Sequence, residues 1–178
     1  FNLPVDDRLP LELGTMALAK FKEYNDIYQI AGTYVTISRY LNIYGQYNQA
    51  LDSLTKALEY VNLHHKLYYS DAHEEQDILK PYVEKETVRT EIRWITGKDI
   101  ETGQTLHVKT VPEWISSIRE QLSVAYAGLG MKAQSDYNRN VYMEILELTR
   151  QDKESESRYL ALEKESKLLN WILLFVIL

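Results

Sequence analysis

The chain has 178 residues, 45% of them hydrophobic, which is enough for one domain of ordinary size with a substantial core. Its formal net charge is -6 and no basic run occurs, which argues against a nucleic-acid surface, since phosphate binding needs clustered Lys and Arg. The absence of cysteine excludes a disulfide framework, thiol catalysis and a zinc–thiolate site.

Apolar residues recur at spacings of three and four over residues 11–24, 27–44 and 47–63, which predicts three amphipathic helices. Asn25-Asp26 ends the first helix and offers an N-cap for the second, and Gly45-Gln46 forms the next turn. The predicted apolar face of the first helix comprises Leu13, Met16, Ala17, Phe21 and Tyr24.

Residues 65–111 lack a long helical period and are predicted to form an insertion. Val88, Ile92 and Ile95 predict a short helix over 87–96, whereas 97–99 and 101–104 have turn composition and 106–108 suit a small hairpin. An insertion in a repeat protein often lies on the binding face. The alternative of a long capping loop stays open.

A second pair of helices is predicted after the insertion. Pro112 suits the first turn of a helix that ends near Gly128, and a partner helix follows the turn at 128–130. Residues 150–170 alternate in charge and predict a mostly polar helix, of a kind that bridges solvent or contacts a partner. The predicted apolar positions are Ile115, Ile118, Leu122, Ala125, Tyr126 and Leu129 in the first helix, and Ala133, Tyr137, Val141, Ile145 and Leu148 in the second.

The segment from Gly45 to Leu58 resembles the second half of a tetratricopeptide repeat. That family places glycine, an aromatic residue, alanine, a bulky residue and alanine at spacings that this chain matches. Small residues allow neighbouring helices to approach closely. The matching residues are Gly45, Tyr47, Ala50, Leu54 and Ala57.

The resemblance extends over about 34 residues, 31–64, and in a degenerate form over 112–149. Ser38 stands where the family often has glycine, and Asn62 replaces the usual closing proline. The implied fold is all-α, with tetratricopeptide-like stacked antiparallel helical hairpins, an inserted irregular segment and a long C-terminal helix. Most aromatic residues at repeat positions are predicted to serve packing, among them Tyr34, Tyr47, Tyr126 and Tyr137.

Two further stretches carry a second resemblance. One runs from Val111-Pro112-Glu113-Trp114 to Asn140, and the other leads from Thr149 through the polar helix to Trp171. Together they resemble the extracytoplasmic sensor region of bacterial membrane-bound two-component sensor histidine kinases with tetratricopeptide-like repeats. The resemblance implies a periplasmic domain at the inner membrane that binds a protein, peptide or small-molecule signal. It also implies relay through the C-terminal helix and a homodimeric full-length protein.

The predicted organisation is 1–64 repeat helices, 65–111 insertion, 112–149 second hairpin, 150–170 polar connecting helix and 171–178 start of a transmembrane helix. From Trp171 to Leu178 the chain is apolar with no closing signal, although about 20 such residues are needed to cross a bilayer. A short helix end packed on the core is the alternative. The N-terminus lacks an initiator Met and signal-peptide features, so we expect the chain to start inside a longer gene product.

Catalysis is not expected within this chain, because it contains no nucleophile elbow, phosphate-cradling glycine loop or zinc-protease motif. No cofactor is expected either, and kinase activity would belong to other parts of a full-length protein. His64, His65 and His73 lie close to acidic residues in sequence, but their spacing matches no recognised metal site. Solvated charge is favoured there over metal binding.

By repeat register, Val35, Arg39 and Asn42 are predicted to line the concave, ligand- or partner-binding face of the first hairpin. Arg39 suits a carboxylate or phosphate, and an ordinary surface ion pair is the alternative that stays open. The competing functional hypothesis is a soluble, cytoplasmic tetratricopeptide scaffold, or the repeat domain of a transcription regulator, acting through protein–protein interaction.

Overall fold

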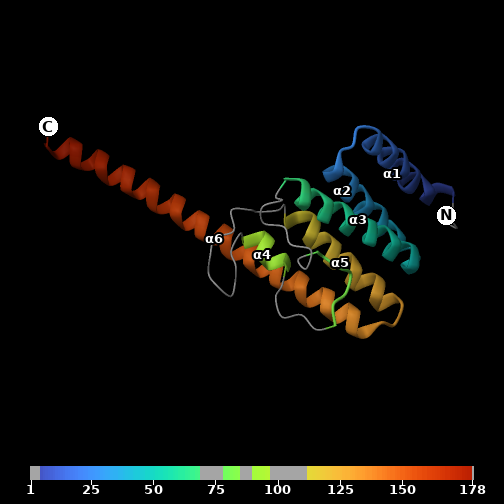
Figure 1. Ribbon diagram of the computed structural model, residues 1–178. Helices are drawn as coiled ribbons and strands as arrows, with labels where there is room; N and C mark the ends of the chain where they lie inside the picture. The colour runs from blue at the N-terminus through green and yellow to red at the C-terminus, as the bar shows by residue number, and fades with distance from the viewer. Residues whose placement is uncertain (1–4, 69–77, 85–89, 97–111, 178) are drawn as a thin grey trace. The chain divides into compact units, whose positions relative to one another are not determined.

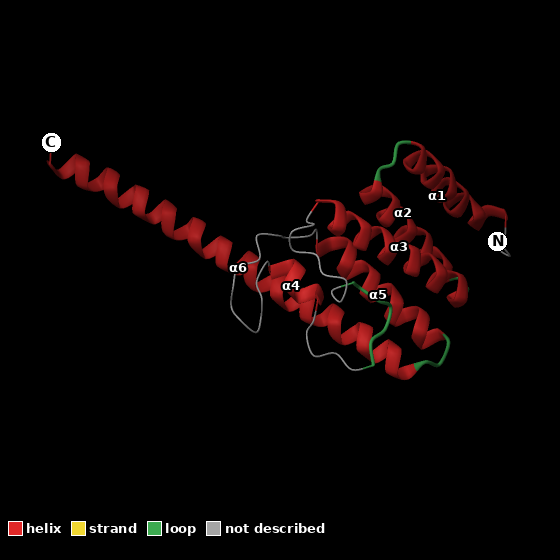
Figure 2. Cartoon of the chain, in the orientation of Figure 1, coloured by secondary structure: helices red, strands yellow, loops and turns green. Residues whose placement is uncertain are grey.

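The computed structural model describes residues 5–68, 78–84, 90–96 and 112–177. Every regular element among these residues is a helix, which confirms the predicted all-α class (Figure 2). The turns predicted at 97–99 and 101–104, the hairpin at 106–108 and His73 with its acidic neighbours lie outside the described residues. The chain divides into two compact units, Phe1–Ile145 and Leu146–Leu178.

The first unit contains the helices α1 (Val5–Glu23), α2 (Ile27–Ile43), α3 (Tyr47–Tyr68), α4 (Thr90–Thr96) and α5 (Pro112–Gly128), and the beginning of α6 (Lys132–Ile177). α1 packs on α2, α2 packs on α3, and α5 packs on both α2 and α3. Figure 1 shows these helices side by side. α3 continues past the predicted start of the insertion at residue 65 and ends at Tyr68.

Three helix-to-helix turns share one backbone geometry. Asn25, Gly45 and Gly130 each have a positive φ, of 53°, 72° and 73°, the left-handed conformation that ends helices and that glycine and asparagine tolerate best. The residue after each of them donates its backbone N–H to a carbonyl five residues back. The bonds are Asp26 N to Phe21 O (2.9 Å), Gln46 N to Leu41 O (2.8 Å) and Met131 N to Tyr126 O (2.9 Å).

The predicted cap of the second helix is confirmed. The Asp26 side chain accepts a hydrogen bond from the Gln29 backbone N–H at 3.1 Å, and so satisfies one of the donors that a helix start leaves without a partner.

The helices on either side of each turn run antiparallel. Tyr34 of α2 stacks on Tyr60 of α3 with ring centroids 5.9 Å apart, although the two lie far apart in sequence on opposite sides of the turn at Gly45. The hydroxyl of Ser135 in α6 donates to the backbone carbonyl of Ser123 in α5 at 2.9 Å across the turn at Gly130. Both contacts pair residues at similar distances from their turn, as antiparallel hairpins require.

Helices α2 and α5 run parallel to each other. Tyr28, near the start of α2, contacts Trp114, near the start of α5, with ring centroids 5.5 Å apart. Asn42, near the end of α2, bonds to Gln121, well along α5. Gly32 allows this approach, because a Cβ there would overlap the Trp114 ring.

The core lies where these helices meet. Ala50, Leu54 and Ala57 are completely buried, which confirms their predicted packing role, because small side chains there bring α3 close to its neighbours. The predicted apolar face of α5 is confirmed at all positions except Leu129, which follows the end of the helix and is half-buried. The buried positions are Ile115, Ile118, Leu122 and Ala125 at 0% exposure and Tyr126 at 9%. On α6, the predicted core residues Val141 and Ile145 are buried as well, at 0% and 1%, whereas the prediction is wrong at Ala133, which is exposed.

For α1 the predicted apolar face is wrong at Leu13, Met16 and Tyr24, which are 54%, 67% and 71% exposed. The stripe that packs contains Leu11, which is fully buried, and Gly14, whose backbone lies against Ile37 of α2. Because α1 carries apolar residues on two stripes, periodicity alone does not decide which stripe meets α2.

The second unit consists of the continuation of α6, which runs without interruption from Lys132 to Ile177. The sequence predicts two helices there, 133–148 and 150–170. Over 157–164 every side chain is exposed, including those of Tyr159, Leu160 and Leu162. None of the described helices combines the length and the apolar character needed to cross a membrane.

Candidate recognition surface and buried network

The structure places the three predicted binding residues in different environments. Val35 and Asn42 lie in the interior, with 2% and 6% of their surface exposed. The Arg39 side chain, in contrast, is 54% exposed. A ligand at the surface of α2 can therefore reach Arg39 directly but neither of the other two, so the predicted binding face depends on Arg39.

Asn42 joins the two hairpins. Its amide nitrogen donates to both the backbone carbonyl and the side-chain oxygen of Gln121, each at 3.0 Å. Gln121 is itself buried, so these bonds form away from competing water. Asn42 thus fixes how far α2 is shifted along α5, and lies directly below the surface that carries Arg39.

Arg39 faces α5. Its Nη2 lies 4.0 Å from Oε2 of Glu120, and the two side chains are 54% and 40% exposed. An ion pair this open adds about 0–1 kcal/mol to stability. Burial, and then the nearby Glu120 carboxylate, raise the pKa of the Tyr142 phenol of α6.

Two exposed apolar side chains extend this surface. Ile43 follows Arg39 by one helical turn on α2 and is 68% exposed, and Val124 follows Glu120 by one turn on α5 and is 43% exposed. Because α2 and α5 are parallel, both lie on the same side of the Arg39–Glu120 pair. We call these four residues the α2/α5 face. Its mixture of a cation, an anion and apolar area suits contact with a partner or ligand.

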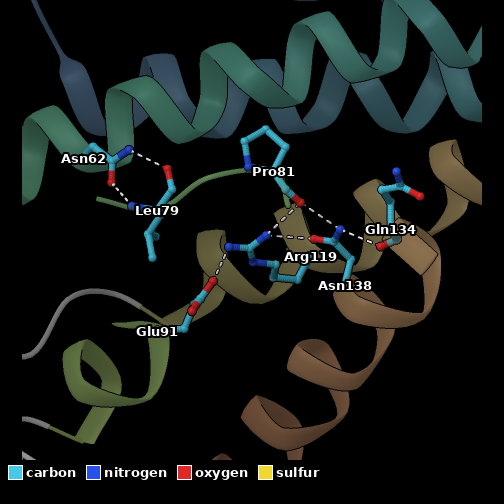
Figure 3. A network of polar contacts seen from close by, with 7 residues as sticks. All are labelled: Asn62, Leu79, Pro81, Glu91, Arg119, Gln134 and Asn138. Atoms are coloured by element: carbon cyan, nitrogen blue, oxygen red, sulfur yellow. Dashed lines mark hydrogen bonds and ion pairs between the residues drawn. The ribbon is translucent and has the colours of Figure 1, made fainter. Parts of the chain in front are cut away.

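A buried polar network lies at the insertion (Figure 3). Arg119 of α5 is 1% exposed and forms an ion pair with Glu91 of α4, also 1% exposed. The Arg119 Nη1 donates to Oδ1 of Asn138 at 2.8 Å and to the Pro81 carbonyl at 3.3 Å. Asn138 of α6 is fully buried and donates to the same Pro81 carbonyl at 2.9 Å. The network therefore connects α4, α5, α6 and the chain at Pro81.

Two more contacts fasten the insertion to α3. Asn62 donates to the Leu79 carbonyl and accepts from the Leu79 N–H, both at 2.9 Å (Figure 3). His65 stacks on Trp94 of α4, with ring centroids 3.7 Å apart and an interplanar angle of 4°. Both His65 and Trp94 are buried, at 1% and 3%. Segments 78–84 and 90–96 are thus packed parts of the first unit, held by polar as well as apolar contacts.

Two polar residues at unexpected positions in the sequence indicate this network, although helical periodicity alone does not explain them. Arg119 lies within the apolar stripe of α5, between Ile115 and Leu122, which is an unusual place for a charge. Asn62 is the departure from the closing proline of the repeat, and the structure gives it a role in holding Leu79. A charged or amide side chain inside an apolar stripe needs a buried partner, and here the partners come from the insertion.

The histidines show no sign of a metal site in the part of the chain that the structure describes, where no group of three or more His, Cys, Asp or Glu side chains converges. His64 is half-buried and has aromatic neighbours, Tyr68 at 4.7 Å and Tyr28 at 6.1 Å between ring centroids. Burial lowers the pKa of His64 below its usual 6.5.

The fold and its contacts define an all-helical protein with two helical hairpins and a packed insertion. The sequence model of a family described as "Domain of unknown function (DUF5113)" matches residues 24–178, which is most of the chain. The chain therefore belongs to the DUF5113 family. No curated protein and no solved structure matches it.

Proposed function

We propose that this chain is a tetratricopeptide-like recognition domain that senses a protein, peptide or small-molecule signal for a membrane-anchored histidine kinase. The observation that carries the proposal is the order and direction of packing. α2 pairs antiparallel with α3, and α5 then packs on both while running parallel to α2. Stacked repeats of two helices have this arrangement, with α2–α3 as one repeat and α5–α6 as the next.

The equal turns support a repeat origin. Gly45 lies in the turn within the first proposed repeat and Gly130 in the turn within the second, and the two share a left-handed φ and the same bonding pattern. The same residue type and backbone geometry at corresponding positions is what a degenerate repeat is expected to keep.

The α2/α5 face supports recognition. In a repeat protein the first helices of successive repeats line one surface, and α2 and α5 hold these positions here. Arg39 and Glu120 are only loosely paired at 4.0 Å, so Arg39 can turn to a ligand at small cost. Ile43 and Val124 add exposed apolar area beside them.

The continuity of α6 supports the proposed relay. α6 starts with Asn138, Val141 and Ile145 packed in the first unit and continues to Ile177. A ligand that prefers one of two packings of the hairpins would bias the position of α6 by its difference in affinity for the two. The membrane anchor, the periplasmic location and the kinase partner of this relay are proposed from the sequence resemblance of 111–140 and 149–171.

The test uses the full-length gene product in cells, with a transcriptional reporter of signal output and a stimulus screen. Arg39→Glu and Val124→Asp should each reduce the stimulus response, since they reverse a charge and remove apolar area on the α2/α5 face. Arg139→Glu is the matched control, because Arg139 is also an exposed arginine in an ion pair but is not one of the four residues of this face. Circular dichroism of the purified variants establishes that they fold.

Deletion of residues 1–148 should abolish the response. An unchanged response in that deletion would refute the sensor role. A full-length protein that fractionates with soluble proteins would favour the scaffold alternative instead.

A further inference from the structure

A groove on another side of α2 combines cationic and aromatic side chains. It has a volume of about 300 Å³, lies among α1, α2 and α3, and is small by the standards of ligand sites. Tyr34, on its α2 wall, is five residues from Arg39, which corresponds to about 140° around the helix, so the groove and the α2/α5 face are separate. The lining residues are Lys22, Tyr34, Lys56, Glu59, Tyr60 and Leu63.

The wall of the groove is a pair of stacked tyrosines. Tyr34 and Tyr60 have ring centroids 5.9 Å apart and an interplanar angle of 26°, and both rings are half-buried. Tyrosine in such a position offers a rigid apolar surface and a hydroxyl. Leu63, 40% exposed, adds apolar area one turn along α3 from Tyr60.

The cations come from two different helices. Lys22 of α1 donates to the Tyr34 hydroxyl at 3.0 Å, and its ammonium nitrogen lies 5.3 Å from the centroid of that ring. Because the Tyr34 oxygen accepts this bond, its own proton stays available for donation to a ligand. Lys56 of α3 pairs with Glu59 at 3.0 Å.

The groove carries more positive than negative charge, with two lysines against one glutamate, in a chain whose net charge is -6. The two ammonium groups also repel each other. The hydrogen bond to Tyr34 raises the pKa of Lys22, whereas burial and the charge of Lys56 act against that rise. An anion placed between the lysines would relieve this repulsion.

We propose that this groove binds a small aromatic acid, with its carboxylate or phosphate between Lys22 and Lys56 and its ring against the Tyr34–Tyr60 stack. Ammonium groups act as compact point charges for such headgroups, and the phenol of Tyr34 supplies a directed donor. The volume of the groove is enough for a single ring with its headgroup. Binding at this groove does not depend on the sensor role, because it involves none of the residues of the α2/α5 face.

The experiment measures binding to the 178-residue chain by isothermal titration calorimetry and by chemical-shift changes of the tyrosine rings. The probes are phenyl phosphate, benzoate, inorganic phosphate and benzyl alcohol. Phenyl phosphate and benzoate separate the two headgroups. Inorganic phosphate lacks the ring and benzyl alcohol lacks the charge. We expect saturable binding of at least one aromatic acid and no binding of benzyl alcohol. Inorganic phosphate should bind about tenfold more weakly than that aromatic acid.

Substitutions then locate the site. Lys22→Gln and Lys56→Gln should each weaken binding of the aromatic acid about tenfold, whereas Lys20→Gln should leave it unchanged. Lys20 is a matched control, since it is an exposed lysine on the same helix as Lys22 but pairs with Glu23 outside the groove. Glu59→Gln removes the opposing charge and should tighten binding several-fold, a gain that misfolding cannot produce.

Three results would overturn the proposal. The first is no saturable binding of either aromatic acid at millimolar concentration. The second is equal binding by the wild-type chain and the Lys22→Gln/Lys56→Gln double variant. The third is binding of benzyl alcohol as tight as that of benzoate, which would show an apolar site without a role for charge.

Discussion

Substitution of the buried Arg119 should cause a large loss of folding stability. Its side chain is 1% exposed and pairs with Glu91, which is equally buried. Arg119→Met keeps the length and apolar stem of the side chain but removes the charge, so Glu91 is left in the interior without its cation. Loss of one partner of a buried ion pair typically destabilises a protein by about 3–5 kcal/mol.

The individual contacts agree with that range. The bond from Arg119 to Oδ1 of Asn138 is 2.8 Å long and charge-assisted, and bonds of this kind contribute about 1.5–3 kcal/mol. The Pro81 carbonyl keeps its bond from Asn138 at 2.9 Å, so it adds little to the loss. The remainder is the cost of leaving Glu91 unpaired. We therefore expect the free energy of unfolding to fall by about 3–5 kcal/mol.

Urea denaturation followed by circular dichroism measures this change. Arg139→Met is the matched control, because Arg139 pairs with Asp136 at 2.8 Å but is 62% exposed, and it should cost about 0–1 kcal/mol. The double variant Arg119→Met/Glu91→Leu should recover part of the loss, since it leaves no unpaired charge. Equal effects of Arg119→Met and Arg139→Met would refute the reasoning, because they would mean that the Arg119–Glu91 pair is open to water.

Three further outcomes are expected. Asn62→Ala removes both bonds to Leu79 and should lower the free energy of unfolding by about 1–3 kcal/mol, with faster proteolysis near Leu79. Unchanged proteolysis would show that these two bonds do not hold the insertion on α3. Gly32→Ala should be net destabilising in urea denaturation, since about 1–3 kcal/mol of overcrowding against Trp114 exceeds the gain in helix propensity; a stabilised variant would contradict this packing. Burial lowers the pKa of His64 in the folded chain, so the unfolded chain binds a proton at His64 more readily than the folded chain does. The part of the folding free energy that depends on neutral His64 is present above pH 6.5 and should be lost as the pH falls through the folded-state pKa. His64→Gln should make Tm less dependent on pH between about 7.5 and 5.5. An unaltered dependence of Tm on pH would mean that other titratable groups cause the loss of stability.

Much of the helical framework was predictable from local patterns. The turn residues Asn25, Gly45 and Gly130 lie where the helices end, because left-handed backbone geometry favours those residue types in any context. The core positions Ala50 and Ala57 were predictable from the repeat spacing, since small residues on one stripe imply a close neighbour.

The candidate site was less predictable. Val35 and Asn42 were expected on a binding face, but they are buried, because α5 covers this part of α2. The position of α5 decides which of these residues of α2 stay exposed. Along the chain, however, α3 and the insertion lie between α2 and α5. Long-range packing of this kind leaves no local period in the sequence.

The groove of the aromatic-acid proposal was missed for a similar reason. Lys22, Tyr34 and Lys56 come from three helices, and none of them departs from an ordinary surface composition. The spacing predicts a packing role for Tyr34, and its ring does pack on Tyr60, yet its hydroxyl also accepts a hydrogen bond from Lys22 at the groove. One side chain serves both roles, which spacing alone does not indicate.

By itself the sequence determined the all-helical class, the turns and most of the buried stripes, since these depend on propensity, capping and periodicity over neighbouring residues. The tertiary structure decided which stripe of α1 packs, that Arg119 has Glu91 as its buried partner, and which of the predicted binding residues is exposed. Those properties depend on which distant segments pack together. The free energy of burying a charge, in particular, depends on whether the fold places an opposite charge beside it.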